Sequence, residues 1–140
     1  MRPVEQELSR TTEARLKANL VRKLRELLPD FVIIRHEDRN LAGIPDMSVT
    51  GNGMTSWWEC KHAHPAIRSR GIQDLMCRQL EKAGVCYYII WNETRNVRST
   101  SICRPRDLAA DDKTEPVWWC AGFDHKAIAK FIAHVHHAER

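Results

Sequence analysis

Residues 43–61, GIPDMSVTGNGMTSWWECK, decide the fold of this chain. Two short runs with strand-like composition, 47–50 and 55–58, lie on either side of the dipeptide Asn52-Gly53. Asn-Gly is a strong signal for a two-residue type I′ turn, in which both central residues have positive φ. The stretch is therefore predicted to form a β-hairpin.

The predicted hairpin brings two carboxylates together. With Asn52-Gly53 as the turn, Asp46 lies directly opposite Glu59, and side chains paired in this way have Cβ atoms about 4.5–5.5 Å apart. Because side chains alternate along a strand, Lys61 shares the face of Glu59. Two opposed carboxylates are destabilising without a cation, and an ordinary solvated Lys–Glu pair does not explain the arrangement. The hairpin therefore predicts a cation-binding site.

Alternation also divides the hairpin into a polar and an apolar face. The polar face is expected to form a site, and the apolar face is expected to pack in a core. The polar face carries Asp46, Ser48, Thr50, Thr55, Glu59 and Lys61, and the apolar face carries Met47, Val49, Met54, Trp58 and Cys60.

Length and composition fit one globular domain that spans residues 1–140. Of the 140 residues, 43% are hydrophobic and 29% are charged, which excludes a disordered or fibrous chain. The longest apolar run, 85–91, is too short to cross a bilayer, and the N-terminus lacks the apolar segment of a signal peptide. We therefore expect a cytoplasmic protein with no membrane partner. Five cysteines without a Cys-x-x-Cys pair are expected to be reduced and buried.

Basic residues surround the predicted site. The chain has a net charge of +4 at pH 7, which suits a polyanionic partner. Acidic residues at a site with basic residues around it are typical of a metal-dependent enzyme that acts on phosphates, although a solvated surface is the commoner reason for any single arginine. The basic residues from the motif onward are Lys61, His62, His64, Arg68, Arg70, Arg78, Lys82, Arg95, Arg98, Arg104 and Arg106.

Hydrophobic periodicity and turn signals predict the other elements. Together with the hairpin, their order gives an α/β fold with a central mixed sheet flanked by helices. A near-continuous apolar run such as 85–91 is typical of a strand buried on both faces. The predicted elements are a helix at 9–28, a strand at 31–35, a helix at 66–83, a strand at 85–91, strands at 99–103 and 117–120, and a helix from the N-cap Asp124 to about His137.

One further carboxylate belongs to the apolar side of the first helix. Glu13 precedes Leu16 and Leu20 at helical spacing, which places it on the inward stripe. A carboxylate at the edge of such a stripe is usually only its solvated end. Here the predicted pair of Asp46 and Glu59 provides a site for it to face.

The sequence Pro45-Asp46 followed by Glu59-Cys60-Lys61 resembles the motif of the PD-(D/E)XK nuclease superfamily. The resemblance covers residues 12–91 and implies a restriction-endonuclease-like core with the order αβββαβ. Within the superfamily the chain is most similar to the virus-type replication-repair nuclease (VRR-NUC) group, and it is also similar to small archaeal-type Holliday junction resolvases. Both groups share Gly43-Ile44-Pro45-Asp46 and the helix residue Glu13 with this chain. The VRR-NUC group also shares Gln73 ahead of Leu80-Glu81-Lys82-Ala83-Gly84.

The chemistry of these residues suits Mg²⁺ (or Mn²⁺) as the cofactor. Magnesium prefers hard oxygen ligands and keeps several waters, so the predicted ligands are Asp46, Glu59 and the backbone carbonyl of Cys60. A bound ion polarises the scissile phosphate and activates a water. Lys61 would orient that water or stabilise the charge that develops on the phosphate.

The resemblance adds two catalytic residues and a partner subunit. Glu13 is implied to contribute to the metal site, often through water. Gln73 is implied to help arrange the site from the second helix. Related stand-alone nucleases pair as homodimers, so a homodimer is expected by analogy.

Candidate DNA-binding residues lie beside the motif. Trp57 shares the hairpin face with the carboxylates and is the candidate for stacking on an exposed base. A zinc site on His62 and His64 lacks a credible fourth ligand. These two histidines would either contact phosphate or be exposed loop residues without a function. The histidines at 134, 136 and 137 are expected to be a solvated helix end. The full candidate set is His62, His64, Arg68, Arg70 and Trp57.

Together these features predict a metal-dependent, structure-specific endodeoxyribonuclease, with branched or Holliday-junction DNA as the leading substrate. The small size leaves no room for a separate sequence-reading domain. Two alternatives stay open: a restriction-type endonuclease that cuts linear duplex DNA, and an inactive nucleic-acid-binding module on the same fold. The intact acidic and basic positions argue against the inactive module.

Overall fold

The structure is a computed structural model that describes residues 2–37, 43–63, 72–107 and 115–138, apart from the side chains of residues 2–12, 72 and 73. Its elements follow the predicted order. They are α1 (Arg2–Leu27), β1 (Val32–Arg35), β2 (Met47–Gly51), β3 (Met54–Ala63), α2 (Ile72–Ala83), β4 (Val85–Thr94), β5 (Val97–Cys103), a single 3-10 turn η1 (Pro105–Asp107), β6 (Trp118–Ala121) and α3 (His125–Ala138).

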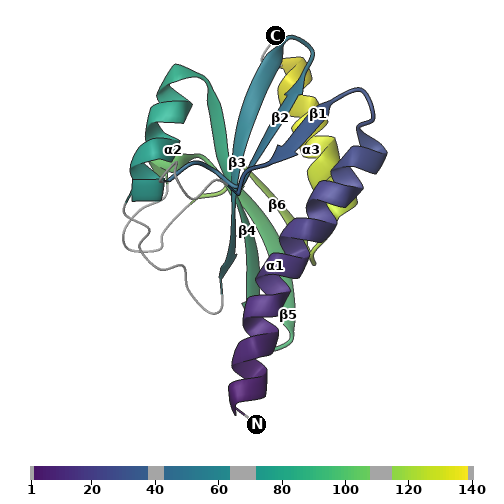
Figure 1. Cartoon of the computed structure of the whole chain (residues 1–140), viewed down its shortest axis with the longest axis vertical. Helices are drawn as coiled ribbons and strands as arrows, with labels where there is room; N and C mark the ends of the chain where they lie inside the picture. Colours follow the sequence, from purple (N-terminus) through teal and green to yellow (C-terminus); the bar gives the residue numbers. More distant parts are fainter. Residues whose placement is uncertain (1, 38–42, 64–71, 108–114, 139–140) are drawn as a thin grey trace.

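One six-stranded mixed sheet with the order β1-β2-β3-β4-β5-β6 organises the chain. Neighbouring strands are antiparallel except β3 and β4, which are parallel and are connected through α2. Helices α1 and α3 lie on one face of the sheet and α2 lies on the other (Figure 1). The predicted α/β fold with a mixed sheet flanked by helices is confirmed. None of the described helices is long and apolar enough to cross a membrane.

The β2–β3 hairpin forms as the Asn-Gly signal predicts. Asn52 and Gly53 have φ angles of 53° and 77°. Both angles lie in the left-handed region that a type I′ turn requires and that Asn and Gly tolerate best. Met47 pairs with Trp58 across the hairpin, so the predicted register is confirmed.

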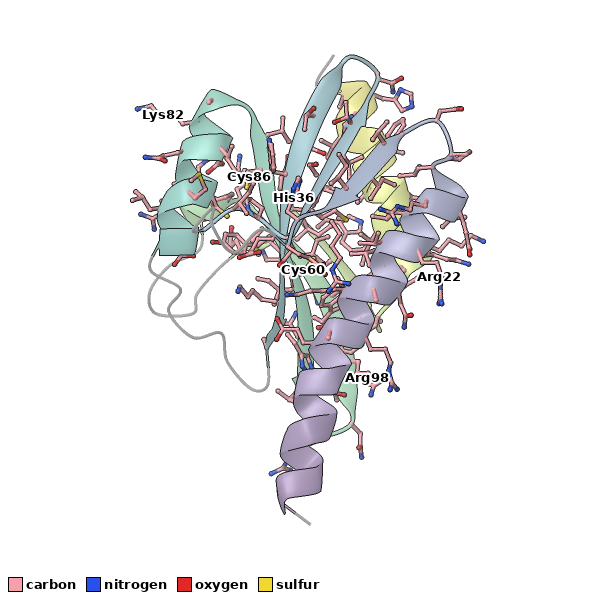
Figure 2. The ribbon with its side chains drawn as sticks, viewed as in Figure 1. Arg22, His36, Cys60, Lys82, Cys86 and Arg98 are labelled. Atoms are coloured by element: carbon pink, nitrogen blue, oxygen red, sulfur yellow. The ribbon has the colours of Figure 1, made fainter. Side chains whose placement is uncertain are left out.

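Each face of the sheet has its own core. On the side of α1 and α3, Trp58 and Cys60 of β3 are buried with Leu20 and Leu24 of α1. Figure 2 shows Cys60 toward α1 and Cys86 toward α2. The smaller cluster on the α2 side contains Ala63, Cys77, Cys86, Tyr88, Ile90 and Cys103.

The predicted polar face of the hairpin is less solvated than expected. Ser48 and Glu59 are buried, and Trp57 packs against the cluster under α2. The reason is that β3 is an interior strand with helices on both sides of the sheet. This face therefore combines a site with a second small core.

Differences from the predicted elements are confined to their ends. Strand β4 runs on to Thr94 because it continues into a hairpin with β5, whose turn places Arg95 at a φ of 51°. Residues 66–71 of the predicted second helix lie outside the described residues. Asp124 caps α3 as predicted, because its Oδ1 accepts a hydrogen bond from Ala127 N–H at 3.0 Å.

The cysteines are free thiols, as predicted. Four of the five are buried, whereas Cys120 is only partly buried. Burial raises the pKa of the Cys60 thiol well above its ordinary value, so this side chain is a neutral core residue rather than a reactive one.

The C-terminal histidines are not all solvated as predicted, because His136 is fully buried. Its Nδ1 donates to the Gly51 carbonyl oxygen at 2.9 Å, and its Nε2 accepts from the Ser56 hydroxyl at 2.8 Å. Trp58 Nε1–H donates in turn to Ser56 Oγ at 2.7 Å. This network is satisfied by a neutral imidazole, and burial lowers the pKa of His136.

We expect the free energy of unfolding to fall at mildly acidic pH because of His136. Its pKa is lower in the folded protein than the ordinary value of 6.5, so below that value the unfolded chain binds more protons and stability decreases as pH falls. Thermal unfolding of wild type and His136→Gln between about pH 5 and 7.5 measures the effect. The wild type should lose stability more steeply, by at most about 1.4 kcal/mol per pH unit. Parallel pH profiles would show that His136 does not titrate on unfolding.

Candidate active site

The site lies where β2 begins, beside the middle of β3. His36 N–H donates to the Asp46 carbonyl oxygen at 2.8 Å, which extends the β1–β2 ladder and fixes the Asp46 backbone. Asp46 N–H donates to Glu59 Oε1 at 3.2 Å, and Cys60 N–H donates to Asp46 Oδ2 at 2.8 Å. Each carboxylate is thus held by a backbone donor of the opposite strand, as the hairpin register requires.

Glu59 is the buried member of the pair, with 0% of its surface exposed. Its Oε2 has no hydrogen-bond partner among the described residues, and Lys61 Nζ lies 3.6 Å away from it. Burial and the neighbouring Asp46 carboxylate raise the pKa of Glu59 to about 9, although the Lys61 charge acts in the opposite direction. Glu59 therefore holds a proton at neutral pH while no cation is bound.

Asp46 is the ionised member of the pair. Burial opposes its ionisation, but the Glu59 side chain, the charge of Lys17 and the Cys60 N–H together lower the pKa of Asp46. Lys17 Nζ lies 3.2 Å from Asp46 Oδ1 and 3.8 Å from Glu13 Oε1. The ammonium of Lys17 on α1 is therefore a direct counter-charge for Asp46.

Lys17 is a residue of the site that the sequence motifs do not predict. A local signal was present, because Lys17 follows Glu13 at the four-residue spacing at which helical side chains meet. The contact with Asp46 has no local signal, since it arises only when α1 packs over the end of β2. Glu13 itself lies at the edge of the site, with its side chain 36% exposed.

Two of the predicted DNA-binding residues have partners inside the protein. Trp57 is partly buried, and its ring stacks on His36 with 5.2 Å between centroids. His62 Nε2 lies 3.1 Å from Glu93 Oε1, and its side chain is only 5% exposed. The exposed-loop interpretation of His62 is therefore wrong, because β3 extends through Ala63 and carries His62 into the sheet.

The remaining predicted residues are only partly covered by the structure. Gln73 lies in the first turn of α2, and its side chain is not described. His64, Arg68 and Arg70 lie outside the described residues. Their roles stay predictions.

The donor set suits a magnesium-type cation that keeps part of its own water shell. Asp46 and Glu59 offer carboxylate oxygens. Glu59 Oε2, which has no hydrogen-bond partner among the described residues, is a buried oxygen that a cation would satisfy. The N–H and C=O of one strand residue point to the same side, so the Cys60 carbonyl also faces the pair. Among the described residues, no three side chains of His, Cys, Asp or Glu form a preassembled metal cage. Waters and substrate oxygens would have to complete the shell.

Comparison with known proteins identifies the fold. Neither a family model nor a curated protein sequence matches this chain. Among solved structures it is similar to Archaeoglobus fulgidus Hjc, a Holliday junction resolvase from an archaeal hyperthermophile, with a TM-score of 0.52 and 14% identity over 88% of this chain and 98% of that chain. The chain has the fold of this resolvase. At such low identity the similarity establishes the fold alone, and the resemblance to the VRR-NUC group stays a prediction.

We expect Glu59→Gln to be at least as stable as wild type in EDTA, whereas Asp46→Asn should lose about 1–3 kcal/mol. Glutamine replaces a carboxyl group that already holds a proton, whereas asparagine removes the charge that Lys17 faces. Between the ordinary Glu59 pKa of 4.5 and the raised value of about 9, the folded protein holds this proton and the unfolded chain does not. Wild type therefore loses stability as pH rises toward 9. The advantage of Glu59→Gln in thermal unfolding should therefore grow over that range.

Each of the two variants is the control for the other, because both replace one carboxyl group of the same pair by an amide. A Glu59→Gln advantage that stays constant as the pH rises from about 5 to 9 would show that Glu59 is ionised in the folded protein.

Proposed function

We propose that this protein is a divalent-metal-dependent nuclease of the PD-(D/E)XK type that hydrolyses phosphodiester bonds in DNA. The observation that carries the proposal is the placement of Asp46 directly opposite Glu59, with Lys61 next to Glu59. The structural similarity to a Holliday junction resolvase supports branched DNA, and four-way junctions in particular, as the leading substrate.

The residues take different roles according to their charge and position. Asp46, Glu59 and the Cys60 carbonyl would hold the cation, which supplies an activated water and polarises the scissile phosphate. Lys61 Nζ lies 3.6 Å from Glu59 Oε2, where its ammonium would orient the attacking water or stabilise the charge that develops on the phosphate. Glu13 would accept a hydrogen bond from a metal-bound water at the α1 side. The roles of Glu13 and Gln73, and the homodimer, rest on the resemblance alone.

A basic groove next to the site suits the backbone of a nucleic-acid strand. Arg35 pairs with Met47 in the β1–β2 ladder, one residue from Asp46. Arg25 is held in place because its Nη2 donates to the Ile33 carbonyl oxygen at 2.9 Å. Guanidinium groups that line a groove can bind phosphates without reading sequence. The groove has a volume of about 420 Å³ and is lined by Ala18, Val21, Arg22, Arg25, Glu26 and Arg35.

Two other functions remain distinguishable from this one. An inactive binding module needs no opposed carboxylates, whereas a fully buried Glu59 opposite Asp46, with a raised pKa, is typical of a catalytic site. A restriction-type enzyme would share the site but would cut linear duplex at a defined sequence. The nucleic acid that the protein binds or cuts distinguishes these functions, because the geometry of the site is the same in all of them.

We expect cleavage of a labelled four-way junction in Mg²⁺ or Mn²⁺ and none in EDTA. Glu59→Gln, Asp46→Asn and Lys61→Met should each lower the cleavage rate by at least about 100-fold, because the first two remove a ligand of the cation and the third removes the ammonium beside it. Flap, single-stranded, linear duplex and RNA versions of the substrate, tested in parallel, identify the preferred structure. Glu59→Gln is the most informative variant, because the fold is expected to tolerate it.

Three results would count against the proposal or refine it. Cleavage that survives EDTA or Glu59→Gln would exclude this site. Junction binding without cleavage in any divalent cation would favour the inactive module. Site-specific cutting of linear duplex would favour the restriction-type enzyme.

We expect each of Arg22→Gln, Arg25→Gln and Arg35→Gln to weaken DNA binding, measured in EDTA so that the proposed metal-dependent cleavage does not occur, and to do so for every sequence alike. The slope of log affinity against log salt should fall by about one for each phosphate contact removed. Lys130→Gln, on the exposed surface of α3, is the matched control. If the three arginine variants retain the wild-type slope, the strand does not run along this groove.

A further inference from the structure

Both oxygens of Asp46 are engaged by the protein itself. Oδ2 accepts a hydrogen bond from Cys60 N–H at 2.8 Å, and Oδ1 lies 3.2 Å from the Lys17 ammonium. The same ammonium lies 3.8 Å from Glu13 Oε1. Lys17 therefore stands between two carboxylates that the proposed function assigns to the metal site.

The position of Lys17 is built into the fold. Leu20 and Leu24 follow it on the same face of α1 and are fully buried, so they fix the helix against the sheet. The Lys17 side chain is 23% exposed. Although burial opposes the charge, Asp46 and Glu13 raise the pKa of Lys17. A flexible four-carbon stem carries the ammonium, so it can leave Asp46 while α1 stays in place.

We propose that Lys17 is the counter-cation of the metal-free site, and that a divalent cation has to displace its ammonium from Asp46 Oδ1 in order to bind. The inference deepens the proposed function, because it takes from it that Asp46 is a metal ligand. Two cations on one oxygen of a partly buried carboxylate repel each other strongly. Lys17 thus sets the metal affinity without contact with the reacting atoms, which makes it a positioning residue.

A purely structural salt bridge makes the opposite prediction. If Lys17 only ties α1 to the start of β2, its removal would loosen Asp46 and would leave metal binding unchanged or weaker. Under displacement, removal of the ammonium frees Asp46 Oδ1 and tightens metal binding. The sign of the change in affinity separates the two roles.

The experiment measures Mn²⁺ binding by the full chain without DNA, through the EPR signal of free Mn²⁺. Lys17→Met should bind Mn²⁺ roughly tenfold more tightly than wild type, as for the loss of one competing ion pair. Lys17→Arg keeps the charge and should bind like wild type. The matched control is Lys23→Met. In wild type the Lys23 ammonium lies 3.6 Å from Glu26 Oε2 on the same helix. Unchanged or weaker binding by Lys17→Met overturns the proposal.

A second measurement uses wild type, so it does not depend on the folding of a variant. The rate at which acetic anhydride acetylates Lys17, followed by peptide mass spectrometry with Lys23 as the internal reference, should rise when Mn²⁺ is added, because the displaced ammonium loses its carboxylate partners. A ratio of the two rates that Mn²⁺ leaves unchanged overturns the proposal.

The two proposals fail in distinguishable ways. Mn²⁺ binding that displaces Lys17, without cleavage of any nucleic acid, would overturn the proposed function and leave the role of Lys17 intact. Metal-dependent cleavage by wild type, together with unchanged Mn²⁺ affinity in Lys17→Met, would overturn only the role of Lys17.

Discussion

The register of the β2–β3 hairpin is the constraint on which the rest of the structure depends. Two backbone hydrogen bonds, from Asp46 N–H to Glu59 at 3.2 Å and from Cys60 N–H to Asp46 at 2.8 Å, hold the carboxylates together. A slip of one residue would turn every side chain of β3 to the other face, so that Glu59 would enter the core beneath α1. The Asn52-Gly53 turn, with two positive φ angles, opposes this slip.

The site is a compromise between stability and binding. Glu59 is fully buried, and one of its oxygens has no hydrogen-bond partner in the described part of the chain, an arrangement that stability alone would disfavour. Its raised pKa keeps the carboxyl neutral until a cation is bound. His136 is the contrasting case, because both of its ring nitrogens have partners. A buried group with incomplete hydrogen bonding indicates a binding role, whereas a satisfied one indicates a structural role.

Local signals in the sequence are sufficient for the parts of the site that lie within one turn or one element. Asn52-Gly53 determines the hairpin register without reference to the rest of the chain, and helical spacing places Glu13 at the inward edge of α1. Lys17 and His136 have partners on other elements, 29 and 80 residues away along the chain. Periodicity carries no information about which elements meet, so these contacts could be found only in the folded structure. The second core under α2 could not be predicted for the same reason. It covers the face of the hairpin that the alternation of side chains predicts to be polar.

On the proposed mechanism, the charge of the site changes when a cation binds. In the metal-free site Glu59 keeps its proton, and the carboxylates of Glu13 and Asp46 are balanced by the ammonium groups of Lys17 and Lys61. A divalent cation adds two positive charges, and release of the Glu59 proton adds one negative charge, so the site acquires one net positive charge. A phosphodiester carries one negative charge and is therefore attracted to the loaded site more than to the metal-free one. Metal binding and nucleic-acid binding are thereby coupled, and because such coupling is reciprocal, the substrate strengthens metal binding in turn.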